Sequence, residues 1–430
     1  MILFDLSRLV SRAGRGTPTG IDRVELAYAE HLIASRKSLC FTLMTPLGFG
    51  EVSRVEANAY AEQLARAWRR TGSPPQISRA KRLARSLRAA ALWRGRRALL
   101  RQSRREAGVV YMLVSHHHLE KCRAIARLKR LAQARFVCLI HDLIPIEFPE
   151  YALPGQNDKH RRRIESAAAL ADAVIVNSTV TRDGFAPYLT RAGRAPPVLF
   201  APLGVDLAAA LPVVSPPVKP PYFVCLGTIE ARKNHLLLLN LWRQLAAELG
   251  EAAPRLVLIG QRGWETENAI DMLERCPALR GVVLERSDVA DAEAACLIQG
   301  AQAVLLPSFA EGFGFPLVEA LALGVPVLCS NLAALRENGG DVPEYLDPLD
   351  GLAWRNAIID YALPASPRRA AQLGRLSRWT PPTWRDHFAA VDALIAELQS
   401  VGQYEAEHST AAGTKRRPSW FDDRRTATIR

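Results

Sequence analysis

The sequence predicts an α/β protein built from two doubly wound parallel sheets. Three observations carry this prediction: short apolar runs alternate with amphipathic stretches, the runs are rich in Val, Ile and Leu, and a proline-rich segment divides them into two series. Alternating strands and helices are the pattern of βαβ units. Strands that are apolar on both faces belong to sheets that helices cover on both sides.

The apolar runs define the expected elements in order. The first series of strands is expected at residues 2–6, 41–44, 109–114, 136–140, 173–176 and 198–201, and the second at 222–226, 255–259, 281–284, 303–306 and 325–329. Helices are expected between them, among others at residues 21–33, 236–249 and 318–323.

A proline-rich segment separates the two series. Residues 211–221 contain five prolines in eleven positions, a density that resists both helix and central strand. The sequence therefore predicts an N-terminal domain at residues 1–205, a linker at 206–221 and a C-terminal domain at 222–380. We expect a final helix at 381–400 to cross back to the first domain and a disordered tail at 401–430.

The composition is that of a globular protein. Of 430 residues, 49% are hydrophobic and 23% are charged, which excludes wholesale disorder. No apolar run reaches the roughly 18–20 residues that span a bilayer, and the N-terminus lacks the features of a secretory signal. The seven cysteines are scattered and form no C-x-x-C pair. These features predict a cytoplasmic protein without a disulfide framework.

The most informative segment is residues 305–331, whose pattern predicts a strand, a glycine-bearing loop, a helix and another strand. Gly312 and Gly314 let the backbone approach a ligand closely, and Pro316 fits the first helical position. N–H groups and a positive helix end favour a diphosphate there. Glu311 and Glu319 flank this site and suit hydroxyl groups, which donate charge-assisted hydrogen bonds to carboxylates. A diphosphate with a hydroxyl-rich group on either side describes a nucleotide sugar.

These residues resemble a known family. The run E-G-F-G-F-P-L-V-E, from Glu311 to Glu319, is similar to the E-x7-E signature of retaining GT-B glycosyltransferases of glycosyltransferase family 4. The segments G-T-I-E-A-R-K-N-H at 227–235, I-G-Q-R-G-W at 259–264, S-N-L-A-A-L-R-E-N-G-G-D at 330–341 and Y-L-D-P-L-D at 345–350 fit the same family. The first two look most like its mannosyltransferase branch, which implies GDP-mannose as the preferred donor, with UDP- and dTDP-sugars as alternatives.

The resemblance also implies roles for individual residues. Glu319 would hold the ribose hydroxyls, and Glu311 would lie at the donor sugar near the anomeric carbon. Arg232 and Lys233 would neutralise the diphosphate as the leaving group departs. His141, at the end of an expected strand, would contact the donor sugar. The implied catalytic set is Glu311, His141, Arg232 and Lys233.

Further residues complete the implied donor site. Gly20 ends the run G-T-P-T-G at 16–20, which resembles the family's first glycine-rich loop near the donor phosphate. Thr228 lies where many family members carry an arginine. The implied donor-binding set is Gly20, Thr228, Arg232, Lys233, Gly312, Phe313, Gly314, Phe315 and Glu319. Each of these residues could instead have a purely structural role. The two glutamates and the Arg232–Lys233 pair could be charged residues near helix starts, Gly20 could serve only a turn, and His141 could be a hydrogen-bonded histidine at the end of a strand.

The sequence predicts no metal and no cofactor besides the donor substrate. His116, His117 and His118 precede Glu120, but adjacent side chains on a strand point to opposite faces and no Cys or Asp cluster accompanies them. No D-x-D pair occurs in the chain, although transferases that bridge a divalent cation need such carboxylates.

The net charge of +13 is concentrated in one segment. Residues 66–105 contain fourteen Lys or Arg and no acid, so the remaining chain is close to neutral. Nucleic acid is not expected, because neither a spread basic surface nor interleaved aromatics appear. Leucines and a tryptophan among the arginines predict an amphipathic helix or helical pair on an anionic membrane surface: Leu83, Leu87, Leu92, Trp93, Leu99 and Leu100. A solvated insertion is the alternative.

The resemblance thus implies a retaining hexosyltransferase of polysaccharide or lipopolysaccharide synthesis. It would move a sugar, preferably mannose from GDP-mannose, to a hydroxyl of a lipid-linked oligosaccharide or other saccharide acceptor. It would act in the cytoplasm, peripherally at the inner face of the cytoplasmic membrane. Two alternatives remain: a GT-B enzyme of another class, such as an epimerase or phosphorylase, and a non-catalytic membrane-bound scaffold.

Overall fold

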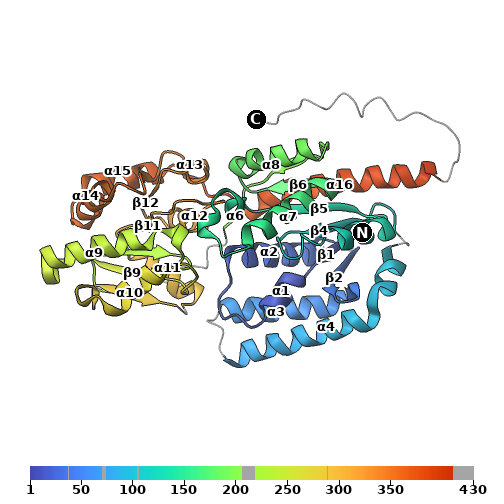
Figure 1. The fold of residues 1–430 in the computed structure, drawn as a ribbon, viewed down its shortest axis with the longest axis horizontal. Coiled ribbons are helices and arrows are strands. Elements are labelled where there is room, and N and C mark those ends of the chain that lie inside the picture. Colours follow the sequence, from blue (N-terminus) through green and yellow to red (C-terminus); the bar gives the residue numbers. More distant parts are fainter. Residues whose placement is uncertain (37, 70–73, 104–105, 206–217, 288, 410–430) are drawn as a thin grey trace.

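The two predicted sheets are present, each in its own α/β domain, and the domains lie side by side (Figure 1). The computed structural model describes residues 1–36, 38–69, 74–103, 106–205, 218–287 and 289–409. The predicted linker lies mostly at residues 206–217, outside the described residues, as do residues 70–73 and 104–105 of the basic segment.

The N-terminal sheet has seven strands in the order β3-β2-β1-β4-β5-β6-β7. All neighbours pair in parallel except β2 and β3, which form an antiparallel hairpin. The strands are β1 (Ile2–Asp5), β2 (Leu39–Thr45), β3 (Gly48–Val52), β4 (Val110–Leu113), β5 (Arg135–Ile140), β6 (Ala173–Val176) and β7 (Val198–Phe200). The helices are α1 (Ser7–Arg12), α2 (Gly20–Ser35), α3 (Arg54–Arg69), α4 (Pro74–Ser103), α5 (Cys122–Ala132), α6 (Ile144–Glu147), α7 (Gln156–Leu170) and α8 (Thr179–Arg191), with a short 3₁₀ turn η1 (Pro149–Tyr151).

The C-terminal sheet has six parallel strands in the order β10-β9-β8-β11-β12-β13, the doubly wound order that reverses direction beside its first strand. The strands are β8 (Tyr222–Leu226), β9 (Arg255–Ile259), β10 (Val283–Arg286), β11 (Val304–Leu306), β12 (Val327–Ser330) and β13 (Glu344–Leu346). The helices are α9 (His235–Leu249), α10 (Glu267–Arg275), α11 (Asp291–Gln299), α12 (Phe315–Ala322), α13 (Ala333–Gly339), α14 (Gly351–Ala362) and α15 (Pro367–Leu376), with 3₁₀ turns η2 (Ala231–Lys233), η3 (Gly250–Ala252) and η4 (Pro277–Leu279).

Apolar side chains on both faces of the strands explain why helices cover both faces of each sheet. In β1, Ile2 and Phe4 enter one hydrophobic core and Leu3 enters the other, and all three are at most 1% exposed. Since successive side chains of a strand point to opposite faces, an apolar run without alternation must be buried twice. This burial of both strand faces is the property from which the sequence predicts the doubly wound α/β class.

Two strands escaped the sequence analysis. β3 contains two glycines in five residues, and β13 has only three residues, which include Glu344. Both lie at the edges of their sheets, where a strand needs less apolar character because only one neighbour pairs with it. Neither segment therefore carries the continuous apolar run that marks a central strand.

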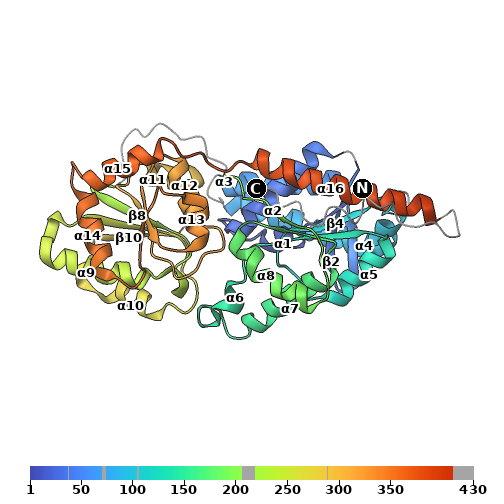
Figure 2. The same ribbon diagram turned by 90° about the horizontal axis from the view of Figure 1, so that it is seen from above.

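The last helix crosses back to the N-terminal domain, as Figure 2 shows. α16 (Trp384–Ser409) is longer than expected. It packs against β4 and β7 of the first domain, and His387 accepts or donates a 2.7 Å hydrogen bond with the hydroxyl of Tyr28 in α2. The predicted disordered tail from residue 401 is therefore wrong for 401–409, which are helical; residues 410–430 lie outside the described residues.

Most of the basic segment forms α4, which packs along β3 and α3 (Figure 1). Leu87 and Leu99, two of the apolar residues of the predicted amphipathic helix, are buried, with 2% and 0% exposed. Their apolar side chains cover the protein's own sheet edge instead. Leu92 and Trp93 remain 44% and 90% exposed. Among the described residues, none of the helices has the length and apolar character that crossing a bilayer requires.

Candidate active site

The two glycine-rich loops meet between the domains. A Cβ atom added to Gly20, at the start of α2, would lie 3.1 Å from the ring of Phe315 at the start of α12. A Cβ atom on Gly312 would lie 2.8 Å both from the carbonyl oxygen of His141 and from Cβ of Asp142. The absence of side chains at both positions lets the two domains approach. Four of the predicted site residues, Gly20, Phe315, Gly312 and His141, thus lie at one cleft.

Glu311 lies between two cations and a hydroxyl. Its Oε1 atom accepts from Nζ of Lys233 at 2.5 Å and from the hydroxyl of Ser308 at 2.7 Å. Its Oε2 atom accepts from the guanidinium of Arg232 at 3.1 Å. Arg232 also pairs with Glu230. The predicted catalytic trio of Glu311, Arg232 and Lys233 is therefore a single buried ion cluster.

The charges in this cluster decide the state of Glu311. Burial by itself would raise the pKa of this carboxyl, but the positive charges of Lys233 and Arg232 outweigh it and lower the pKa to about 2. The carboxylates of Glu311 and Glu230 in turn raise the pKa of Arg232, against the effect of its burial. The cluster thus pairs two cations, Arg232 and Lys233, with two carboxylates, Glu311 and Glu230, and its charges balance.

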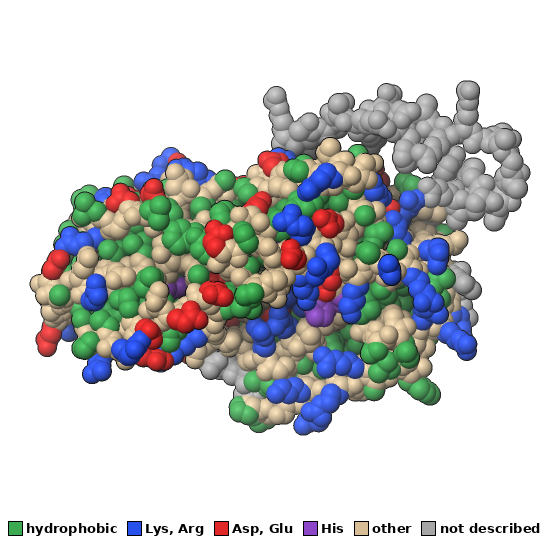
Figure 3. All heavy atoms as spheres, viewed as in Figure 1, with side chains coloured by type: hydrophobic (Ala, Val, Ile, Leu, Met, Phe, Trp, Pro, Cys, Tyr) green, Lys and Arg blue, Asp and Glu red, His purple; other side chains and the backbone are tan. Residues whose placement is uncertain are grey.

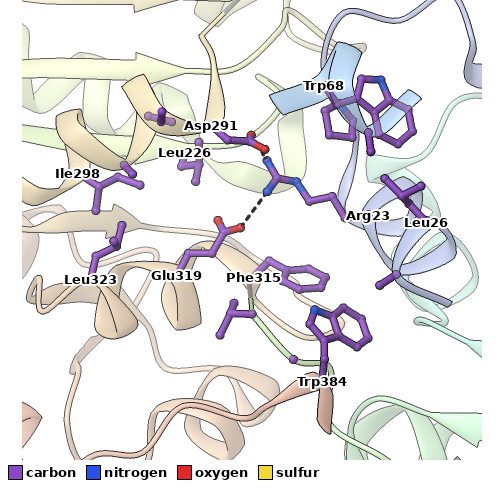
Figure 4. Close-up of a pocket in the computed structure, with 18 of the residues that line it drawn as sticks. Arg23, Leu26, Trp68, Leu226, Asp291, Ile298, Phe315, Glu319, Leu323 and Trp384 are labelled. Atoms are coloured by element: carbon purple, nitrogen blue, oxygen red, sulfur yellow. Dashed lines mark hydrogen bonds and ion pairs between the residues drawn. The ribbon is translucent and has the colours of Figure 1, made fainter. Parts of the chain in front are cut away.

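Glu319 lies one turn into α12 and faces a pocket of about 570 Å³ between the domains (Figure 4). Among the described residues, we find no donor of a hydrogen bond to its carboxylate oxygens, and its ion pair with Arg23 is long, at 3.6 Å. Arg23 belongs to α2 and donates a 2.7 Å hydrogen bond to Asp291 at the start of α11. Burial raises the pKa of Glu319, so this carboxylate lacks the partners that Glu311 has.

Two residues of α13 fix the loop before α12. Gly314 has a left-handed backbone (φ +87°), and a Cβ atom there would lie 2.4 Å from Leu335 of α13. The side chain of Asn338 donates to the carbonyl of Phe313 at 2.7 Å. Helix α12 begins at Phe315. Pro316 has no N–H, and the N–H groups of Leu317 and Val318 donate to the carbonyl of Gly314, so the N–H of Phe315 is the group that this first turn leaves for a ligand.

His141 lies at the cleft but is only 4% exposed. Its Nε2–H donates to the carbonyl of Val114 at 2.9 Å, and its backbone N–H donates to Nε2 of His116 at 3.1 Å. Burial lowers the pKa of His141 to about 4. The ring is therefore neutral near pH 7 and is fixed as the Nε2–H tautomer by the backbone.

Thr228 lies beside the loop that follows β9. A Cβ atom on Gly263 would lie 2.7 Å from its methyl group. The neighbouring Gly227 has φ +139° and leaves room for Lys233, whose Cε would lie 3.5 Å from an added Cβ atom. Gly227, rather than Thr228, thus shapes the lysine's position.

The three adjacent histidines point to different partners. His118 bonds to Asp5 at 3.2 Å, whereas His116 accepts from His141. Within the part of the chain that the structure describes, no group of three or more His, Cys, Asp or Glu residues is arranged to hold a metal ion.

Sequence reasoning missed Arg23, Asp291 and Ser308. Ser308 follows β11 and lies three residues before Glu311, and this closeness in the sequence could have indicated its contact with the Glu311 carboxylate. Arg23 and Asp291 are 268 residues apart in the chain and meet only because the domains close. No local pattern connects them.

Comparison with solved structures identifies the architecture. The chain resembles the Anabaena protein Alr3699/HepE, solved in complex with UDP, with a TM-score of 0.58 over 93% of this chain and 99% of that one, at 16% identity. This chain has the GT-B fold. Residues 220–361 of the GT-B chain match the family model described as "Glycosyl transferases group 1", so the C-terminal domain is a glycosyltransferase group 1 domain.

Two curated relatives from Escherichia coli match parts of the GT-B chain. The O-antigen chain mannosyltransferase B is 39% identical over 129 residues, which cover 30% of this chain and 33% of that protein. The serotype-specific mannosyltransferase WbdA is 26% identical over 223 residues, which cover 48% of this chain and 27% of that protein. The chain thus spans a third or less of the length of these relatives.

Proposed function

We propose that the protein is a retaining glycosyltransferase of the family 4 type, a hexosyltransferase that uses a nucleotide-sugar donor. The observation that supports this most is the pair of glutamates on either side of the α12 N-terminus. Glu311 is ionised and paired with Arg232 and Lys233, whereas Glu319 faces an interdomain pocket. Hydroxyls of the ribose suit Glu319, and the diphosphate suits the N–H groups and cations between the two glutamates.

The reaction would use these groups without a metal ion. Cleavage of the bond between sugar and phosphate leaves negative charge on the departing oxygen. Lys233, Arg232 and the backbone N–H of Phe315 would be fixed donors at that place, so they would lower the barrier without reorganisation. Glu311 would orient the donor sugar hydroxyls, and the neutral His141 would line the opposite wall. We therefore expect activity to survive chelation of divalent cations.

We propose mannose from GDP-mannose as the transferred sugar and a lipid-linked or other saccharide as the acceptor. The names of the two Escherichia coli relatives, both mannosyltransferases and one of O-antigen, support this choice. The acceptor would be a precursor of a surface polysaccharide, which is assembled on lipid at the cytoplasmic face of the membrane. With such an acceptor, the protein would act in the cytoplasm, peripherally bound at that membrane.

The exposed face of α4 supports the membrane contact. Trp93 is 90% exposed beside Leu92 at 44%, and cations surround them. In the view of Figure 3, Lys and Arg side chains gather on the half formed by the N-terminal domain, while both signs mix on the other half. Cations near an anionic surface each contribute about 1 kcal/mol. The exposed cations of α4 are Arg79, Lys81, Arg82, Arg85, Arg88, Arg97 and Arg101.

A transfer assay tests the activity. The purified protein is incubated with GDP-mannose, UDP-glucose or a dTDP-sugar and a polyprenyl-linked saccharide, with and without EDTA, and the product linkage is determined by NMR. We expect mannose transfer with retained anomeric configuration. An epimerised donor or phosphate-dependent cleavage would identify the GT-B enzymes of other classes, and donor binding without any transfer would favour the scaffold.

A vesicle assay tests the membrane contact separately. Replacing Trp93 with Ser together with Arg82→Gln and Arg85→Gln should weaken co-sedimentation with vesicles containing anionic lipid, while leaving binding of free nucleotide unchanged. Leu352→Ser, at a 67% exposed leucine of the C-terminal domain, is the matched control. Undiminished sedimentation of the triple variant would contradict the proposed contact.

A further inference from the structure

One side chain from the N-terminal domain reaches across the interdomain pocket. Arg23 extends from α2 across the cleft, and Figure 4 shows its guanidinium between Asp291 and Glu319. One terminal nitrogen donates to Oδ1 of Asp291 at 2.7 Å, and the other lies 3.6 Å from Oε1 of Glu319. Both carboxylates belong to the C-terminal domain. A single planar group therefore contacts two acids at once.

The pocket around this guanidinium fits a nucleoside. Its volume of about 570 Å³ lies within the range of ligand sites. Leu226, Ile298 and Phe315 supply apolar and aromatic walls, and the carboxylates of Asp291 and Glu319 are the acidic groups of the C-terminal wall. If Glu319 binds the ribose, as the proposed function requires, Asp291 is left to face the base.

We infer that Asp291 reads the base of the donor and selects guanine. Guanine presents two adjacent N–H donors, N1–H and N2–H, on one edge. These belong to the same N–C–N unit that a guanidinium contains. Arg23 places one nitrogen of its unit on Oδ1 of Asp291 and turns the other toward Glu319, so guanine can make a second N–H contact on Asp291 that Arg23 does not make. A carboxylate accepts two parallel N–H bonds from such a unit.

The other bases fit Asp291 poorly. Uracil and thymine offer one N–H between two carbonyl oxygens, and adenine offers an amino group beside a ring nitrogen that accepts. A carboxylate placed against either edge would meet a lone pair, which is a repulsive contact. Asp291 therefore discriminates by attraction to guanine and by repulsion of the alternatives.

Arg23 then has a distinct part in donor binding. It cannot stay on Asp291 while the base is bound there, so the donor must displace it. The guanidinium and the nucleotide compete for the same carboxylates, and the side chains of the pair are 39% and 26% exposed. Exchange of one charge-assisted contact for another keeps Asp291 partnered in both states.

The decisive experiment breaks the ion pair from either side. Calorimetric titration measures the affinity of GDP, UDP, ADP and dTDP for the wild type, Asp291→Asn and Arg23→Gln. We expect the wild type to prefer GDP and Asp291→Asn to lose about 10- to 100-fold in GDP affinity, with little change for UDP. Arg23→Gln should bind GDP more tightly, by up to about fivefold, because its competition is removed.

The opposite changes in GDP affinity expected for the two variants distinguish recognition of the base by Asp291 from a purely structural ion pair. If the pair only holds the domains together, both variants shift GDP affinity in the same direction, and that result overturns the inference. A wild type that prefers UDP, ADP or dTDP also overturns it, while leaving the glycosyltransferase proposal intact. Failure of the wild type to bind any of the four nucleotides overturns both.

Matched substitutions outside the pocket complete the design. Asp271→Asn changes an acid of α10 that pairs with Arg275, and Arg36→Gln changes an arginine at the end of α2 that pairs with Asp392. Neither residue lines the pocket. Both controls should bind all four nucleotides as the wild type does, and a shift in either that equals the shift of its partner variant contradicts the assignment.

Discussion

The two glutamates of the candidate site have the same chemistry and opposite surroundings. Glu311 has three hydrogen-bonding partners within 3.1 Å and a side chain that is 7% exposed. Glu319 has an ion pair at 3.6 Å and a side chain that is 21% exposed. The pKa of the first is lowered to about 2, and that of the second is raised.

This difference shows which part of the site exists before a ligand binds. The Glu311 cluster is complete: its charges balance within the C-terminal domain and fix the geometry. The Glu319 side depends on a group from the other domain, Arg23, and leaves a pocket. The first region is expected to decide the rate of the chemistry, and the second the affinity for the donor.

The largest effect is expected from Lys233→Ala. Removal of the ammonium should lower kcat on the order of 10²- to 10³-fold, because the departing phosphate loses a fixed cation. It should also lower Tm, since Glu311 then keeps a buried charge with one cation fewer. Steady-state kinetics and thermal unfolding measure the two effects.

A double substitution distinguishes catalysis from folding. Adding Glu311→Gln to Lys233→Ala removes the uncompensated charge, so Tm should recover while activity stays lost. If the double variant recovers activity together with Tm, the cluster has only a structural role.

Gly312→Ala should impair closure of the cleft. The added methyl group meets the carbonyl of His141 and Cβ of Asp142 at 2.8 Å, and the backbone must move to make room. We expect kcat/KM to fall about 10²-fold, as misplacement of reacting groups does, with scattering measurements showing a more open molecule. Gly374→Ala, in α15 with nothing within 4 Å of the new Cβ atom, should leave both unchanged.

The two glutamates should also respond differently to pH. Hydroxyls bind the ionised carboxylate, so donor affinity should fall as pH drops through the raised pKa of Glu319, above its ordinary value of 4.5. Glu311 stays ionised until about pH 2, and its contribution to stability, present above pH 4.5, is lost only toward that value. Glu319→Gln should weaken donor binding about 10-fold and abolish the pH dependence. Persistence of the same titration in Glu319→Gln would assign it to another group.

The smallest effect is expected at Glu337. Its carboxylate accepts from the backbone N–H of Thr179 at 2.9 Å and from the Thr179 hydroxyl at 2.8 Å, which joins α13 to the first turn of α8 across the domains. Glu337→Gln weakens a charge-assisted contact worth about 1 kcal/mol, so KM for the donor should rise a few-fold with kcat unchanged. A fall in kcat as large as that of Gly312→Ala would show that this contact controls closure.

Much of this arrangement could be predicted from the sequence because its signals are local. The apolar runs of the central strands depend on burial of both faces, and the Glu311–Glu319 spacing places a loop and a helix start beside a strand. The inward face of α4 could not be predicted, because leucines among arginines suit a lipid surface and a protein core equally. The contact of Arg23 with Asp291 was beyond reach, since it depends on how two domains close.

The two places where the chain passes between the domains touch each other. A Cβ atom on Gly204, before the second domain, would lie 2.1 Å from the backbone nitrogen of Trp384, where α16 begins its return. The amide of Val205 donates to the carbonyl of Pro382 at 3.4 Å. Gly204 and Val205 thus hold the end of the described N-terminal domain against the start of α16, so we expect a change in the angle between the domains to pivot at this contact. The stacked rings of Phe309 and of Tyr151, four residues after the end of α6, also join the domains. Since α6 lies on the side away from α16 (Figure 2), we expect opening at this contact to part these rings.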